Sequence, residues 1–275
     1  MTISQQVDDA KFLIAQGRHI GALTILSLTV AASSRKVFPA KVTKSLRNND
    51  VMRDEEAFTL FLGGRIRRIV QNVNIGPEFC ASGFTVMFKG EPKAVEYLIY
   101  KYYRNGLVHE ADLPEDVEFV ESQPGGATFA NNGVSVGISC GDKLILDYGW
   151  LDVLVKAVVE APCNGEEFGI KHYKLVANDG IDEVEFESEI IAKYNASQAR
   201  VNTFKNSVRL LSHDSILSSN DNELIGLFLA RVRAGEISGV ARLASRGLAD
   251  TEGRLQPSGL AMLRDIAGAY SLVEY

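Results

Sequence analysis

The sequence predicts a mainly α-helical protein, α+β overall, in which a small antiparallel β-insertion separates an N-terminal helical bundle from C-terminal helices. Three patterns support this fold class. Apolar residues recur every three or four positions over residues 7–34, 54–73 and 92–105, as in amphipathic helices. Between residues 117 and 140 they alternate with polar or small residues, as in half-buried strands. Helical spacing then returns from residue 150 onwards.

The first predicted helix runs from Val7 to about Ser34. Gly17 and Gly21 lie within it and would let another helix approach closely, because they carry no side chain. Its apolar run from Ile20 to Ala32 is shorter than the roughly 20 residues that a membrane span needs. We therefore expect a buried core helix and no membrane association.

The second predicted helix, from Asp54 to Val73, begins with three acidic residues, which suit the positive end of the helix dipole. Basic residues lie on this helix and in the polar loop before it: Arg65, Arg67, Arg68, Lys41, Lys44 and Arg47. The three arginines form a candidate RNA-binding patch, because basic side chains track the phosphate backbone. The alternative is a solvated helix face that binds no ligand.

The third helix should begin at Pro92, since the first position of a helix does not need the N–H that proline lacks. Val95, Leu98 and Tyr102 lie on one apolar face of this helix. Gly106 is expected to disrupt it.

The second half of the chain predicts a mixed module. Its expected elements are strands over residues 117–119 and 134–140, a helix over 150–161, a strand over 168–177 and helices from 183 onwards. The change of pattern near residues 112–125 predicts two domains, a helical bundle over 1–120 and a mixed α/β module over 121–275.

Residues 241–266 combine a helix that ends at Gly247-Leu248, a short extended piece and a new helix near Pro257. This order is similar to the latter part of a winged helix-turn-helix, which would bind nucleic acid or dimerise. A structural helical hairpin explains the same pattern.

The strongest chemical signal is the run Arg104-Asn105-Gly106-Leu107-Val108-His109 at the end of the third helix. Arginine holds phosphate through a planar fork of donors, and histidine transfers protons near neutral pH. In a regular α-helix Arg104 and His109 would point about 140° apart. Unwinding at Gly106, or a second copy of the motif across a dimer interface, would bring them together. The alternative is that these side chains only cap the end of the helix.

The motif resembles that of the HEPN superfamily (higher eukaryotes and prokaryotes nucleotide-binding), in which an arginine, often followed by asparagine, precedes a histidine by a few residues. The resemblance covers roughly residues 7–115. It implies a helical bundle that forms a homodimer and cleaves RNA without a metal or other cofactor, often under the control of an antitoxin or another defence-system protein. On this resemblance Arg104 would bind phosphate, Asn105 would occupy the polar position and His109 would be the catalytic imidazole.

The sequence therefore predicts a metal-independent endoribonuclease that would act in a toxin–antitoxin or phage-defence system. The alternative is a catalytically silent dimer that binds nucleotide, RNA or protein, and a third hypothesis is a DNA-binding regulator that uses residues 237–270. The net charge of −6 argues against RNA binding over the whole surface, so we expect any contact with RNA to be confined to a local basic patch. Three widely spaced cysteines, Cys80, Cys140 and Cys163, suit a reducing cytoplasm.

Overall fold

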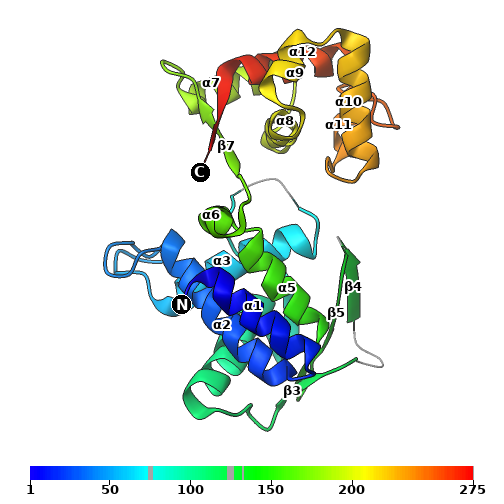
Figure 1. The fold of residues 1–275 in the computed structure, drawn as a ribbon. Coiled ribbons are helices and arrows are strands. Elements are labelled where there is room, and N and C mark those ends of the chain that lie inside the picture. Colours follow the sequence, from blue (N-terminus) through cyan, green and yellow to red (C-terminus); the bar gives the residue numbers. More distant parts are fainter. Residues whose placement is uncertain (74–76, 123–126, 132, 275) are drawn as a thin grey trace. The chain divides into compact units, whose positions relative to one another are not determined.

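The computed structural model describes residues 1–73, 77–122, 127–131 and 133–274 (Figure 1). The described chain forms two compact units, unit 1 up to Lys171 and unit 2 from His172 onwards. Helices dominate both units, so the mainly α, α+β overall fold class is confirmed. The division at 171/172 differs from the predicted boundary near residues 112–125. The reason is that the β-insertion and the helix after it share one hydrophobic core with the N-terminal helices.

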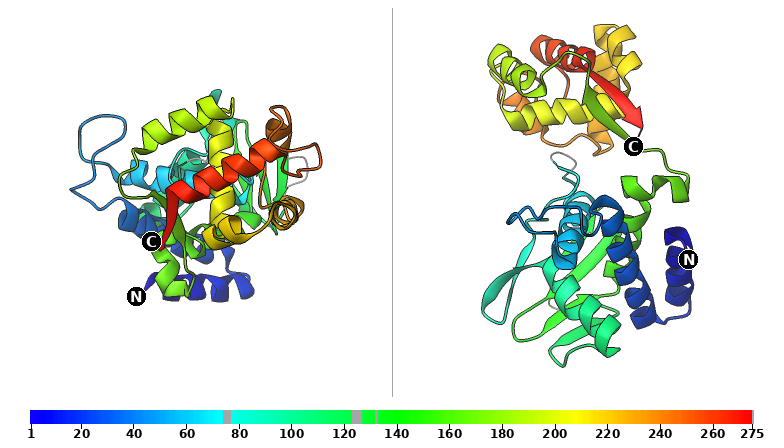
Figure 2. Two further views of the ribbon diagram at one scale, coloured as in Figure 1. Left: turned by 90° about the horizontal axis from the view of Figure 1, so that it is seen from above. Right: turned by 90° about the vertical axis from the view of Figure 1, so that its left-hand side faces the viewer.

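Helices supply most of the core of unit 1. Its helical elements are α1 (Ile3–Ala15), α2 (His19–Val37), α3 (Asp54–Ile69), α4 (Val95–Leu98), the π-helices η1 (Ile99–Arg104) and η2 (Gly106–Glu110), α5 (Gly149–Val159), the 3-10 helix η3 (Pro162–Asn164) and α6 (Gly165–Phe168). Helix α2 packs against α1, α3 and α5, and Figure 2 shows α1 and α2 side by side. These contacts place α2 at the centre of the unit.

The expected helix from Val7 to Ser34 is two helices in the structure. Gly17 adopts a φ of 70°, in the left-handed region that glycine favours, and the chain reverses there between α1 and α2. By length and composition alone α2 could span a membrane. Its inner face, which includes Leu23, Leu26 and Val30, is fully or almost fully buried against the rest of unit 1.

Two small sheets complete unit 1. The strands are β1 (Thr85–Phe88), β2 (Glu91–Ala94), β3 (Val117–Val120), β4 (Ala127–Asn131), β5 (Val134–Ser139) and β6 (Leu144–Asp147). Strands β1 and β2 form an antiparallel pair, and the other four lie in the order β3-β6-β5-β4, with β3 and β6 parallel. Helix α5 packs against β5, where the indole of Trp150 donates a hydrogen bond to the Gly137 carbonyl at 3.0 Å.

Unit 2 is a helical module with one antiparallel pair of strands. Its elements are β7 (Tyr173–Ala177), α7 (Glu183–Lys193), α8 (Gln198–Leu211), α9 (His213–Ser218), α10 (Asp221–Arg233), α11 (Val240–Ala244), α12 (Pro257–Ala269) and β8 (Tyr270–Glu274). Strand β8 returns to pair with β7, where helix was expected up to the C-terminus. The order predicted within residues 241–266 is present: α11 ends, Ala249 and Leu255 form an antiparallel bridge, and α12 begins at Pro257.

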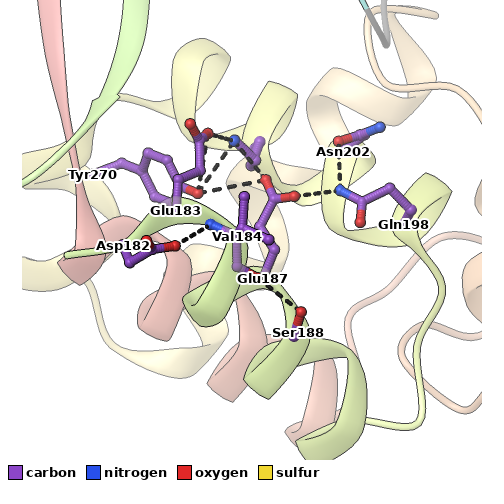
Figure 3. Close-up of polar contacts among 9 residues, drawn as sticks. Asp182, Glu183, Val184, Glu187, Ser188, Gln198, Asn202 and Tyr270 are labelled. Atoms are coloured by element: carbon purple, nitrogen blue, oxygen red, sulfur yellow. Dashed lines mark hydrogen bonds and ion pairs between the residues drawn. The ribbon is translucent and has the colours of Figure 1, made fainter.

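One ion-pair cluster ties α7, α8 and β8 together (Figure 3). The Lys205 ammonium from α8 contacts Glu183 at 2.5 Å and Glu187 at 2.8 Å, and it donates to the Tyr270 hydroxyl at 3.2 Å. These partners raise the pKa of Lys205 despite its partial burial. Because every polar group in the cluster is matched by another, we interpret it as structural.

Candidate active site at the end of the motif helix

The helix that carries the motif is wound mainly as a π-helix. It starts at Val95 as α4, after Pro92 has paired within β2, so the expected helix start at Pro92 is wrong. From Ile99 the winding widens, and the Asn105 N–H bonds to the Tyr100 carbonyl five residues earlier. Hydrogen bonds from i to i+5 bring residues five apart onto one face, and such segments often occur at functional sites.

The wider winding brings the motif side chains together within a single chain. Arg104 Nη1 donates to Asn105 Oδ1 at 2.8 Å, and the same nitrogen lies 3.1 Å from His109 Nε2. A guanidinium can only donate, so the contact is a hydrogen bond in the tautomer whose Nε2 accepts and whose proton sits on Nδ1. The exposed imidazole therefore presents an unprotonated Nε2 next to a fixed cation.

Gly106 serves a different purpose from the one predicted. The helix does not unwind at this residue, which begins η2. A Cβ on Gly106 would lie 2.7 Å from the Asp112 carbonyl oxygen and 3.3 Å from Pro114 Cδ. Glycine thus allows the chain after the helix to fold back against it. The helix ends at Ala111, whose φ of 58° is left-handed.

Arg104 contacts His109 and also lines a small pocket. Its Cζ lies 5.4 Å from the centre of the Tyr100 ring, a cation–π contact. Only Nη1 has hydrogen-bond partners, and the buried Nε has none among the described residues. The pocket has a volume of about 210 Å³ and is lined by Ala31, Ala32, Ser34, Arg35, Asp54, Tyr100 and Arg104.

Three pocket residues were missed by sequence reasoning: Arg35, Asp54 and Tyr100. Arg35 Nε donates to Asp54 Oδ1 at 2.9 Å, and Nη1 donates to the Phe38 carbonyl at 3.0 Å. This pairing joins the end of α2 to the start of α3 and fixes the pocket wall. Burial raises the pKa of Tyr100, although the nearby Arg104 acts to lower it. The basic last turn of α2 and the acidic first turn of α3 were the available signal.

The predicted RNA-binding patch of Arg65, Arg67 and Arg68 requires correction. The Arg65 side chain is only 5% exposed and lies 2.7 Å from Glu78 and 3.6 Å from Glu160. Arg68 contacts the other oxygen of Glu78, also at 2.7 Å. Arg67 is half-buried and donates to the Cys80 sulfur at 3.5 Å. Arg65 and Arg68 hold an internal carboxylate, so they are not free to track a phosphate backbone.

One known protein family matches the N-terminal part of the chain. The family described as Rv1289 matches residues 2–182, which is more than half of the protein. The chain belongs to the Rv1289 family. Comparisons with curated proteins and with solved structures found no match.

The Rv1289 match coincides closely with unit 1. It spans the helices, both sheets of that unit and the motif Arg104 to His109, and it ends a few residues beyond β7. The β-insertion therefore belongs to the same family domain as the helices, in agreement with their shared core. The Rv1289 description names no activity, so a functional proposal depends on the geometry of the site.

Proposed function

We propose that this Rv1289-family protein is a metal-independent endoribonuclease of the HEPN type, with Arg104, Asn105 and His109 as its active site. The observation that carries the proposal is the 3.1 Å contact between Arg104 Nη1 and His109 Nε2. This contact sets a base and a phosphate-binding cation side by side, which is what cleavage of RNA by its own 2′-hydroxyl requires.

The proposed reaction needs only these groups and the substrate. His109 Nε2 takes the proton from a ribose 2′-hydroxyl while the 2′-oxygen attacks the neighbouring phosphorus. Arg104 stabilises the charge that grows on the non-bridging oxygens, and Asn105 holds the guanidinium in place through its 2.8 Å bond. The P–O5′ bond breaks, the leaving 5′-oxygen takes a proton from solvent water, and the protonated His109 returns its proton to solvent. The products are a 2′,3′-cyclic phosphate and a 5′-hydroxyl.

The charge balance around Arg104 supports a phosphate ligand. Among the described residues Arg104 makes no ion pair with a carboxylate, in contrast to Arg65 and Arg68. Its positive charge is therefore available to a ligand. The proposal extends to a cytoplasmic homodimer that is controlled by an antitoxin or another defence-system protein, as the HEPN resemblance implies.

One observation favours a second function, a catalytically silent module that binds RNA or nucleotide. The lone pair of His109 Nε2 already accepts the Arg104 N–H, so the base is occupied in this arrangement. Cleavage requires Arg104 to release the imidazole as it turns to the phosphate. If it does not, the same side chains would bind RNA without cutting it.

The two functions are separated by incubating end-labelled single-stranded RNA with the purified full-length protein in excess chelator. We expect His109→Ala to cut about 10²- to 10⁴-fold more slowly, because the base is lost. Arg104→Ala should lose about 10²- to 10³-fold, through lost stabilisation of the transition state. His213→Ala and Arg18→Ala are matched controls, because His213 lies in α9 and Arg18 lies in the turn between α1 and α2, both outside the site.

The endoribonuclease proposal fails if the wild-type protein cuts no RNA, or if His109→Ala cuts as fast as His213→Ala. RNA binding that is lost in Arg104→Ala without any cleavage by the wild type would instead establish the silent module.

A further inference from the structure

The pocket next to Arg104 lies beyond the groups that the proposed cleavage uses. Arg104 Nη1 is occupied by Asn105 and His109, whereas Nε and Nη2 bond to no described residue. Nε and Nη2 form one edge of the guanidinium, the fork that binds a phosphate or carboxylate through two parallel hydrogen bonds. Nε is buried and lacks an acceptor in this arrangement, so a ligand that reaches this edge when the guanidinium turns would be stabilised by supplying one.

The charges around the pocket favour an anion. Two guanidinium groups, those of Arg35 and Arg104, and one carboxylate, that of Asp54, line it. Arg35 is fixed by Asp54 and by the carbonyl oxygens of Phe38 and Met52, so its charge cannot move away. Asp54 is paired with Arg35 and is 68% exposed, so solvent screens its negative charge more than the charge of the less exposed Arg35. The lining therefore has a net charge of +1 without a ligand and attracts a small anion.

Tyr100 adds a neutral donor to this pocket. Its hydroxyl has no hydrogen-bond partner among the described residues. The Tyr100 side chain lines the pocket together with those of Arg35, Asp54 and Arg104. Burial raises the pKa of Tyr100, which keeps the hydroxyl protonated and able to donate at neutral pH.

The size of the pocket limits the ligand. Pockets for drug-sized molecules have volumes of roughly 300–1,000 Å³, and this one has about 210 Å³. A single phosphate group fits such a volume better than a whole nucleotide does. A phosphate in the pocket would use the guanidinium edge that His109 does not touch, so it would not be the phosphate that is cleaved.

We propose that this pocket binds a second phosphate group of the RNA strand, adjacent to the one that is cleaved, through Tyr100 and the Nε–Nη2 edge of Arg104. This assignment rests on the proposed endoribonuclease function. The preferred substrate is then single-stranded RNA with more than one phosphate. Tyr100 would bind the second phosphate, and the negative charge of Asp54 would oppose the entry of that phosphate into the pocket.

The pocket is tested directly by titrating the full-length protein with inorganic phosphate in a calorimeter. Tyr100→Phe should weaken phosphate binding about tenfold, because a hydrogen bond to a charged group is lost while the ring stays in place. Asp54→Asn should strengthen binding several-fold, since the competing carboxylate is removed. Asp8→Asn is the matched control, because it removes one negative charge from an exposed position of α1 and should leave binding unchanged.

Equal phosphate affinity in the wild type and Tyr100→Phe would overturn the pocket assignment. It would also be overturned if Asp8→Asn strengthened binding as much as Asp54→Asn does, since the effect would then come from net charge alone. These results do not depend on RNA cleavage, so the pocket and the endoribonuclease proposal can fail separately.

A second experiment separates phosphate in RNA from free phosphate. A dinucleoside monophosphate and the same compound with one additional terminal phosphate are compared as cleavage substrates. We expect the additional phosphate to raise kcat/KM about tenfold in the wild type, and Tyr100→Phe to reduce this ratio towards one. An unchanged ratio in Tyr100→Phe would show that the pocket binds only free phosphate and would overturn its role in RNA binding.

Discussion

Two arginines on helices of unit 1 show how differently the same side chain is used. Arg65 in α3 is buried, contacts Glu78 and Glu160, and shares Glu78 with Arg68. Arg104 in η1 is half-buried, contacts an amide and an imidazole, and keeps one edge without acceptors. Both arginines were candidates for phosphate binding in the sequence, but only Arg104 retains an uncompensated charge.

The comparison teaches that the partners of an arginine decide its role more than its neighbours in sequence do. Arg65 belongs to a cluster of three basic residues in four positions, which is a typical sequence sign of a phosphate-binding patch. The carboxylate that neutralises it comes from a segment thirteen residues later. Arg104 stands near fewer basic residues, and its site is made by helix winding and by one imidazole.

The largest expected effect on stability tests the structural side of this comparison. Arg65→Ala should lower the free energy of unfolding of unit 1 by about 3 kcal/mol, because Glu78 keeps only Arg68 as a partner in a largely buried setting. Trp150 is the single tryptophan of the chain and is buried in unit 1, so its fluorescence during urea unfolding reports on this unit.

Arg104→Ala is the matched control and should cost about 1 kcal/mol or less, since it leaves no buried carboxylate without a partner. If both substitutions destabilise unit 1 equally, the distinction between a structural and a functional arginine is wrong.

A smaller effect is expected at a partly exposed ion pair of the same unit. Glu167 accepts from the Lys36 ammonium and from the Ser4 backbone N–H, and the hydrogen bond from Lys36 holds the pKa of this carboxyl below its ordinary value of 4.5. Its contribution to stability is therefore complete above pH 4.5 and is lost as the pH falls through the lowered pKa.

Glu167→Gln should cost about 0.5 kcal/mol at neutral pH, as exposed ion pairs do. The difference from the wild type, followed by urea unfolding from pH 7 to pH 3, should shrink towards the acid end. A difference that is the same at every pH would mean that the side chain contributes by packing alone.

Much of the fold could be predicted from hydrophobic periodicity. Helix α3, strand β5 and helix α5 lie where their apolar patterns placed them. The wrong predictions concern glycine and proline, because each of these residue types occurs in more than one kind of local structure. The sequence pattern predicts Gly17 as a helix-packing glycine, but this residue forms the left-handed turn between α1 and α2. The pattern also predicts that Pro92 starts a helix, but this residue lies in a strand.

The candidate site could be predicted only in part. The residue types in the motif indicated phosphate chemistry, and the structure brings Arg104, Asn105 and His109 together. The π-winding that aligns them has no recognisable sequence pattern, so it was not foreseen. The Arg35–Asp54 pair joins residues nineteen apart across a loop, and such a contact depends on tertiary packing that periodicity does not report.

A double-mutant cycle on RNA cleavage tests the central claim, that Arg104 and His109 act as one chemical unit. Cleavage rates in excess chelator are measured for the wild type, Arg104→Ala, His109→Ala and the double variant. We predict that the double variant cuts about as slowly as the slower single variant, because the second substitution removes a group whose partner has already gone. Losses that multiply, or equal rates in all four proteins, would contradict the account.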